Sequence, residues 1–255
     1  MHIETVGDGP DIVLIHGWAM HSGVFAPLTR QLVPRFRVHL VDLPGHGSSS
    51  RDDDARWDPT GCAAAIAAAT PRAPWVGWSL GGIVALQAAL DFPTQVAGLV
   101  GIAAPPRFVA SADWPQGVPR DAFAQFAEGL KRNYRHTIER FLALEALGSE
   151  HAQTELREMK SHVFDRGTPS LVALEQGLHA LENTDLRAHL PHLRVPSLWI
   201  AGRRDRLVSA DALRWAAQQS PQGRYMEFPS GHAPFIGHAK QIADAIIAFA
   251  QELAA

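Results

Sequence analysis

Cysteine is nearly absent from this chain: its 255 residues contain one, Cys62. A single cysteine cannot form an intrachain disulfide, and the alanine-rich helical stretch around Cys62 indicates a small buried apolar residue. A chain without a disulfide framework favours a reducing compartment. We therefore expect a cytoplasmic protein.

The chain also lacks a strong excess of either charge and has no long apolar run. Its formal net charge of −3 gives no whole-molecule reason to expect nucleic acid or an anionic membrane as a partner. Residues 1–10 have neither the basic start nor the apolar core of a signal peptide, and the first apolar run, residues 12–15, is far too short to span a bilayer. We expect a monomer, and any charge-based partner must bind a local patch.

Short apolar runs rich in β-forming residues recur along the chain, with helical patterns between them. They cover residues 12–18, 36–43, 74–79, 96–103, 196–205 and 224–232. Continuous apolar runs are typical of parallel strands that are covered on both faces, and the intervening helices supply the right-handed crossovers. The sequence predicts an α/β fold with a doubly wound, mostly parallel sheet.

Between Pro105 and about Leu190 the strand-like runs disappear. Helical patterns follow one another over residues 121–134, 136–147, 151–164 and 169–181. An all-helical insertion between two strands predicts a cap over the carboxyl ends of the strands, where ligands bind in open α/β sheets. We expect a core made of residues 1–108 and 189–255, and a cap made of residues 109–188.

The stretch GWSLGG contains a candidate nucleophile, Ser79, flanked by Gly77 and Gly81. In the pattern G-x-S-x-G the serine occupies a strained strand-to-helix turn, and the glycines let strand and helix approach closely. The helix that follows directs its N-terminal N–H groups toward the serine, where an oxyanion would form. The alternative is a small residue at an ordinary corner, because the five-residue pattern also occurs by chance.

A serine nucleophile needs a base and an orienting acid. Among 13 histidines, His232 follows the last strand-like run, and Asp205 ends the one before it. The order Ser79, Asp205, His232, each after a strand, is that of a catalytic triad. Taken alone, Asp205 reads better as a turn or helix-cap carboxylate; the three residues together favour the triad.

The tetrahedral intermediate of acyl transfer needs two donors. We expect one to be the backbone N–H of Leu80, directly after the nucleophile, and the other that of Trp18, after an early strand. His16 beside it more often supports the loop than takes part in chemistry. No metal or organic cofactor is expected, because the histidines lack ligand spacing and triad hydrolysis needs only water.

Five motifs together resemble the α/β-hydrolase superfamily over essentially the whole chain. They are HGWAM (16–20), DLPGHGSS (42–49), GWSLGG (77–82), GRRDRLV (202–208) and GHAPF (231–235). The pairing of HGW with GWSLGG, the cap segment 136–150 and HAPFIGH (232–238) resemble a narrower family, the pimeloyl-[acyl-carrier protein] methyl ester esterases of biotin synthesis. This resemblance implies that Ser79 hydrolyses the methyl ester of a pimeloyl chain on acyl-carrier protein.

The same resemblance implies a substrate channel. Its walls would be Trp18, Ser79, Leu80, His232 and the cap stretch Phe141, Leu142, Ala143, Leu144 and Glu145, with Trp78 as a further candidate. From the residues alone, the amphipathic cap stretch is more often plain packing than a ligand wall.

An acidic carrier protein calls for a basic docking patch. Arg132, His136 and Arg140 recur every four residues, and Arg157 and Lys160 form an i, i+3 pair on the next helical pattern. The resemblance matches Arg140 and Arg157 to docking arginines, whereas His136 and Gln153 stand where arginine is expected. The alternative is a solvated face of mixed charge, because several glutamates lie among these residues.

Other functions remain open at this point. A short-chain carboxylesterase, a lactonase or a carbon–carbon bond hydrolase would share every catalytic residue, and only the cap and pocket discriminate among them. A ligand receptor built on a hydrolase fold would keep the triad and turn over slowly or not at all.

Overall fold

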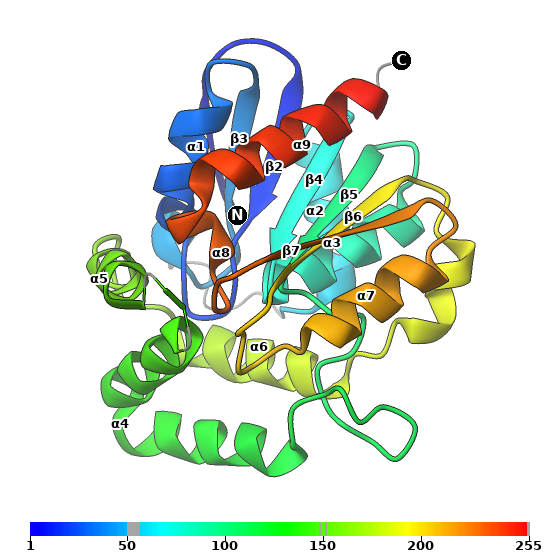
Figure 1. Cartoon of the computed structure of the whole chain (residues 1–255). Helices are drawn as coiled ribbons and strands as arrows, with labels where there is room; N and C mark the ends of the chain where they lie inside the picture. The colour runs from blue at the N-terminus through cyan, green and yellow to red at the C-terminus, as the bar shows by residue number, and fades with distance from the viewer. Residues whose placement is uncertain (50–56, 148, 151, 254–255) are drawn as a thin grey trace.

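A seven-stranded sheet forms the centre of the protein in the computed structural model, which describes residues 1–49, 57–147, 149–150 and 152–253 (Figure 1). The strand order is β1-β3-β2-β4-β5-β6-β7. The strands are β1 (His2–Val6), β2 (Asp11–Ile15), β3 (Arg37–Asp42), β4 (Ala73–Trp78), β5 (Val96–Ile102), β6 (Ser197–Gly202) and β7 (Gly223–Phe228). All neighbouring strands pair in parallel except β1, which pairs antiparallel with β3. The predicted α/β fold is confirmed.

Helices cover both faces of this sheet. On one face lie α1 (Ala26–Leu32) and α9 (Ala239–Leu253), and on the other lie α2 (Pro59–Ala69) and α3 (Leu80–Asp91) (Figure 1). Helix α7 (Ala210–Gln219) packs on β6 and β7, and the short α8 (Pro234–Gly237) precedes α9. Short 3-10 turns cover Ser22–Phe25, Gly47–Ser49 and Arg187–His192.

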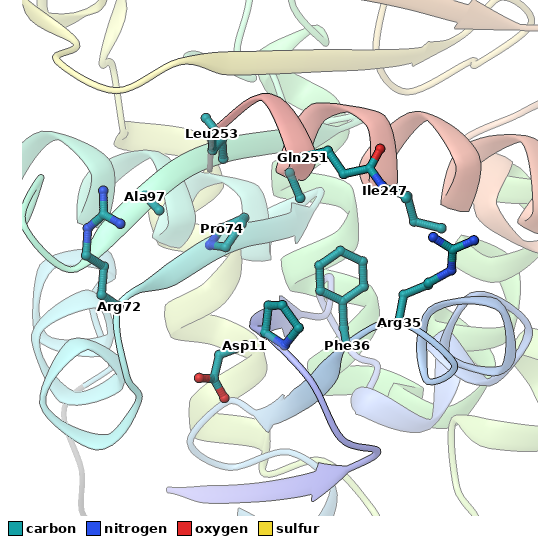
Figure 2. A pocket seen from close by; sticks show the side chains of 11 residues that line it. Asp11, Arg35, Phe36, Arg72, Pro74, Ala97, Ile247, Gln251 and Leu253 are labelled. Carbon is teal, nitrogen blue, oxygen red and sulfur yellow. The ribbon is translucent and has the colours of Figure 1, made fainter. Parts of the chain in front are cut away.

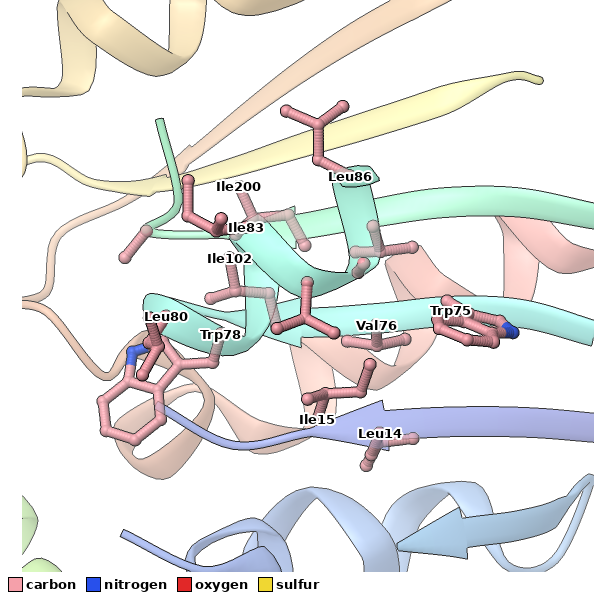
Figure 3. Packing of buried hydrophobic residues seen from close by; sticks show 14 of the residues in the cluster. Leu14, Ile15, Trp75, Val76, Trp78, Leu80, Ile83, Leu86, Ile102 and Ile200 are labelled. Atoms are coloured by element: carbon pink, nitrogen blue, oxygen red, sulfur yellow. The ribbon is translucent and has the colours of Figure 1, made fainter. Parts of the chain in front are cut away.

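The central strands are apolar on both sides because both sides are covered. Leu14, Ile15, Trp75 and Val76 are fully buried, and Figure 3 shows them packed with residues of α3 and the neighbouring strands. Burying side chains of this size stabilises the fold by about 1.5–3 kcal/mol each. This packing fixes the positions of the strands, and therefore of the loops after them that carry the candidate site.

The insertion between β5 and β6 contains three described helices at the carboxyl ends of the strands: α4 (Arg120–Ala146), α5 (Ala152–His162) and α6 (Leu171–Asn183) (Figure 1). The first two predicted helical patterns join in α4, but Asn133, next to the end of the first pattern, is not helical, with φ −158° and ψ 86°. The Asn133 side chain accepts the backbone N–H of His136 at 3.2 Å, so it caps the second half of the helix. Gly148 and His151, which fall in the predicted cap segments, lie outside the described residues.

Buried polar side chains attach this insertion to the rest of the protein. The indole Nε1 of Trp18 donates to the carbonyl oxygen of Leu174 in α6 at 2.9 Å. His21 Nε2 lies 2.6 Å from Asp165 Oδ1, beyond the end of α5. Both contacts join the segment that follows β2 to the insertion. The core and cap boundaries at residues 108 and 189 stay a prediction.

Across the described ranges, we find no helix with both the length and the apolar character that a bilayer crossing requires.

Candidate active site

Ser79 occupies a strained turn between β4 and α3. Its φ of 53° and ψ of −119° lie in a region that residues with a side chain rarely adopt. A Cβ on Gly77 would lie 2.4 Å from the carbonyl oxygen of Gly81, and one on Gly81 would lie 2.2 Å from that of Ile15. Both positions of the G-x-S-x-G pattern therefore require glycine, and the sharp turn presents Ser79 at the carboxyl end of the strand.

His232 and Asp205 meet at the same end of the sheet, after β7 and β6. His232 Nδ1 lies 2.7 Å from Asp205 Oδ2, and both side chains are 1% exposed. The other carboxylate oxygen of Asp205 accepts the backbone N–H groups of Leu207 and Val208 at 2.8 and 3.0 Å. The carboxylate is thus held on both sides, so it keeps the histidine proton on Nδ1 and leaves Nε2 as an acceptor.

The Nε2 atom of His232 is buried and has no hydrogen-bond partner among the described residues. Ser79 and His232 line one cavity, whose free volume of about 30 Å³ is close to that of a single water molecule. Its other walls are apolar: Phe108, Val118, Ala122, Phe123, Phe126, Phe141, Leu178, Leu181 and Leu207. The acceptor nitrogen of His232 and the hydroxyl of Ser79 therefore belong to a cavity with mainly apolar walls.

The backbone of His232 is held by two hydrogen bonds, one to its N–H and one to its carbonyl oxygen. Its N–H donates to the carbonyl oxygen of Glu145 at 2.9 Å, and its carbonyl oxygen accepts the indole N–H of Trp78 at 2.8 Å. The buried Trp78 ring packs against the rings of His232 and Phe235, with centroids 5.7 and 5.2 Å apart. Trp78 is not part of the cavity wall; its contacts support the histidine.

The two candidate oxyanion donors lie beside Ser79. Leu80 is the first residue of α3, so its N–H has no carbonyl partner within the helix. A Cβ on Gly17 would lie 3.2 Å from the Cβ of Ser79, which places the loop that continues into Trp18 against the serine. The Trp18 ring faces the cap and meets Phe141 edge-on at 4.9 Å.

His16 supports this loop, as the sequence indicates. Its Nδ1–H donates to the carbonyl oxygen of Gly17 at 2.8 Å, and its Nε2 accepts the backbone N–H of Leu43 at 3.0 Å. Burial, assisted by the nearby His46, lowers the pKa of His16 to about 3. The ring is therefore neutral at ordinary pH and joins two loops of the site.

The five cap positions 141–145 point in different directions. Phe141 lines the cavity, Leu142 is buried, and Ala143 is exposed. Leu144 lines a separate hollow of about 230 Å³, together with Arg140. Of this stretch, the structure brings Phe141 to the cavity itself and places Glu145 beside His232.

Glu145 is a buried acid next to the candidate base. Its side chain is 1% exposed, and Oε1 lies 4.0 Å from His232 Nε2. Burial, with the carboxyl groups of Asp205 and Glu155 nearby, raises the pKa of Glu145 well above its ordinary value. Burial therefore disfavours the ionised form of this carboxyl group, and with it an ion pair that would trap His232.

The candidate docking residues are all exposed: Arg132, His136, Arg140, Arg157 and Lys160. Arg132 is 2.6 Å from Glu128 and precedes the break in α4 at Asn133. The helix is interrupted between Arg132 and the pair His136 and Arg140, so the three residues do not lie on one continuous helix face. Arg140 and Arg157 are exposed on two different cap helices.

A larger hollow of about 380 Å³ lies at the opposite end of the sheet (Figure 2). Its wall includes Asp11, Pro74 and Ala97, which lie at or near the amino ends of β2, β4 and β5. Asp11 is engaged by His39 at 2.7 Å. Because Ser79, Asp205 and His232 all follow the carboxyl ends of strands, this hollow is remote from them.

Comparison with known proteins agrees with this geometry. The family model described as alpha/beta hydrolase fold matches residues 10–239. The chain belongs to this family. The resemblance drawn from the sequence motifs is thereby confirmed.

Within this family, the chain is similar to curated relatives that share one name. A pimeloyl-[acyl-carrier protein] methyl ester esterase of Xanthomonas oryzae pv. oryzae is 55% identical over 250 residues, covering 98% of each chain. One from Xanthomonas campestris pv. campestris is 53% identical over 254 residues, covering 99% of this chain and all of that one. An esterase from Exiguobacterium antarcticum shares the fold, with a TM-score of 0.89 and 23% identity over 98% of this chain and 95% of that one.

Sequence reasoning did not anticipate several parts of this hydrolase site. Phe108 and Val118 line the cavity from the segment before α4, which has no helical or strand pattern. The carbonyl oxygen of Glu145 that binds His232 carries no side-chain signal at all. Contacts of this kind depend on how distant segments meet, which a single sequence does not reveal.

Proposed function

We propose that this protein is a serine carboxylesterase that hydrolyses the methyl ester of pimeloyl-[acyl-carrier protein], releasing methanol, as a step of biotin synthesis. The observation that carries the proposal is the buried Asp205–His232 pair, 2.7 Å apart, on the same cavity as the strained Ser79. The relatives that are 53–55% identical over nearly the full chain support the substrate.

In the first half of the reaction, His232 Nε2 takes the proton of Ser79 as the hydroxyl oxygen attacks the ester carbonyl. Asp205 holds the ring in the required tautomer and stabilises the imidazolium. The imidazolium then protonates the leaving methanol, and the acyl group remains on Ser79. Burial disfavours an ionised Glu145, which would hold that proton on His232.

The oxygen of the tetrahedral intermediate would be held by the backbone N–H groups of Leu80 and Trp18. Loss of one such donor typically reduces turnover by about 10²–10³-fold. Because these donors belong to the backbone, they depend on the turn at Ser79 and on the loop that His16 supports. Water activated by His232 then releases the acid.

The apolar cavity suits the methylene chain of a pimeloyl group. Phe141, Leu178 and Leu181 contribute cap side chains to it, and Phe108 and Leu207 contribute others. Its free volume of about 30 Å³ is far below the roughly 300–1,000 Å³ of ordinary ligand pockets. Entry of the acyl chain therefore requires the cap helices to move away from the sheet.

The carrier protein would dock on the cap through Arg140 and Arg157, both exposed. Exposed arginines attract an acidic partner as it approaches, and charges at the edge of an interface act mainly on the association rate. Arg135 is less available, because its guanidinium lies 4.1 Å above the Phe164 ring.

The test compares carrier-bound pimeloyl methyl ester with free methyl esters of matched length. We expect a higher kcat/KM for the carrier-bound ester, and a loss of that advantage in the double variant Arg140→Glu, Arg157→Glu. Arg30→Glu, an exposed change on α1, is the matched control for surface charge. Equal rates on both esters would overturn the carrier preference, and no cleavage of either would overturn the esterase.

A further inference from the structure

Two buried polar atoms, one on the candidate base and one on the acid next to it, have no hydrogen-bond partner among the described residues. His232 Nε2 and Glu145 Oε2 have no hydrogen bond to any described residue, and the other oxygen of Glu145 lies 4.0 Å from Nε2. Unpaired buried polar atoms are uncommon, because each costs about 1–3 kcal/mol. A third polar group between the two side chains would supply the hydrogen bond that His232 Nε2 lacks.

The separation of 4.0 Å is too long for a direct hydrogen bond and short enough for one bridging oxygen. A water molecule with two hydrogen bonds of about 2.8 Å at a tetrahedral angle spans about 4.5 Å, and a 4.0 Å span needs an angle of about 90°. A single water therefore fits between the carboxyl group and the imidazole.

We infer that Glu145 positions the hydrolytic water: its carboxyl oxygen accepts one O–H of the water while His232 Nε2 accepts the other. This inference rests on the proposed function, because it concerns the release of the acyl group from Ser79. Either protonation state of the carboxyl group carries an acceptor oxygen, so the role does not require ionisation.

The step balances as follows. One O–H bond of the water breaks, its proton goes to His232 Nε2, and the water oxygen bonds to the acyl carbon. The bond between that carbon and Ser79 Oγ then breaks, and the proton on Nε2 passes to Ser79 Oγ. The other proton of the water stays on the new carboxylic acid, and Glu145 neither gains nor loses a proton.

The carboxyl group of Glu145 is held in place for this role. Glu145 lies in the last turn of α4, and its backbone carbonyl oxygen accepts the N–H of His232 at 2.9 Å. Behind it, Glu155 Oε1 accepts the hydroxyl groups of Ser149 and Ser230 at 2.6 and 3.2 Å. The backbone carbonyl of Glu145 thus binds the N–H of His232, and the carboxyl group of the same residue lies near its Nε2.

This arrangement distinguishes water from an alcohol. Water has two O–H groups, one for His232 and one for Glu145, whereas methanol has only one and must give it to the base. Glu145 therefore favours hydrolysis of the acyl-enzyme over its transfer back to methanol. Without the acceptor oxygen, that advantage disappears.

The experiment measures this competition directly. The full-length protein is given a p-nitrophenyl ester in buffer with added methanol, and the initial ratio of free acid to methyl ester is determined. The ratio is independent of how much of each preparation is folded. We expect Glu145→Leu to lower it by about five-fold, the effect of one hydrogen bond. Glu145→Gln, which keeps an acceptor oxygen, should stay within two-fold of the unmodified protein.

An unchanged ratio in Glu145→Leu overturns the role of Glu145, and so does an equal loss in both variants. Failure of the proposed function looks different: the unmodified protein would then release no p-nitrophenol beyond that of Ser79→Ala.

Discussion

The carbonyl oxygen of Glu145, near the end of the cap helix α4, accepts the backbone N–H of His232 at 2.9 Å. The helix that covers the cavity is therefore bonded to the peptide of the candidate base. On the other side of the same residue, the indole N–H of Trp78 donates to the carbonyl oxygen of His232 at 2.8 Å. The position of the base thus depends on both the cap and the strand that carries the nucleophile.

Trp78→Phe removes the indole N–H and keeps an aromatic ring beside His232. Because the lost hydrogen bond is worth about 1 kcal/mol, we expect kcat to fall about five-fold with KM nearly unchanged. Steady-state kinetics on a soluble ester measure both constants.

Trp75→Phe is the matched control. Trp75 lies on the same strand and is fully buried, and its Nε1 has no partner among the described residues. Its replacement should leave kcat unchanged. If both variants lose activity equally, the loss reflects packing, and the hydrogen bond to His232 is irrelevant.

Gly77→Ala and Gly81→Ala should each abolish the nucleophile turn. The new Cβ atoms would lie 2.4 and 2.2 Å from backbone oxygens, so the strand and helix must separate. We expect a free energy of unfolding lower by about 3 kcal/mol or more in urea denaturation. Gly61→Ala, where the Cβ meets only the Asp58 side chain at 3.0 Å, should change stability by less than about 1 kcal/mol. Tolerance of alanine at residue 77 or 81 would contradict the geometry.

Acid should destabilise the protein through its buried histidines. Burial lowers the pKa of His46 to about 4 and that of His16 to about 3, from 6.5. Below pH 6.5 these two histidines bind protons in the unfolded chain but stay neutral in the folded protein. The free energy of unfolding therefore falls as pH falls. We expect a loss of about 1.4 kcal/mol per pH unit for each histidine, between 6.5 and about 4. His46→Gln should remove the contribution of one histidine to this pH dependence. An unaltered slope of the free energy of unfolding against pH would refute the lowered pKa of His46.

Glu145 should have the opposite effect on stability, lowering the free energy of unfolding as pH rises. Its raised pKa means that the folded protein keeps a proton above pH 4.5, where the unfolded chain has lost it. The free energy of unfolding therefore decreases as pH rises. Glutamine at this position does not titrate, so the stability of Glu145→Gln relative to the unmodified protein should improve as pH rises above 4.5. A constant difference over that range would show that Glu145 is ionised in the folded state.

Much of the fold was predictable because its signals are local. Parallel strands such as β2 and β4 are continuous apolar runs, and the break at Asn133 lies close to the predicted boundary between two helical patterns. Strand β1 was missed because an antiparallel edge strand is half exposed, and residues 2–6 carry no continuous apolar run.

The candidate triad was also predictable, since each member follows a strand in a short motif. The positions of Trp78 and Glu145 were not. Trp78 reads as a channel wall from its place beside Ser79, yet its strand directs the ring toward His232 and Phe235. Glu145 reads as part of an amphipathic helix, and only the packing of that helix against the β7 loop brings it to the base.

The most direct test of the central claim is a single-turnover reaction of the purified protein with the methyl ester of pimeloyl-[acyl-carrier protein], with methanol and the carrier-bound free acid measured together. We predict equal amounts of both products from the unmodified protein and neither from Ser79→Ala. An intact carrier-bound ester in both reactions, or the same product yield from both, would contradict it.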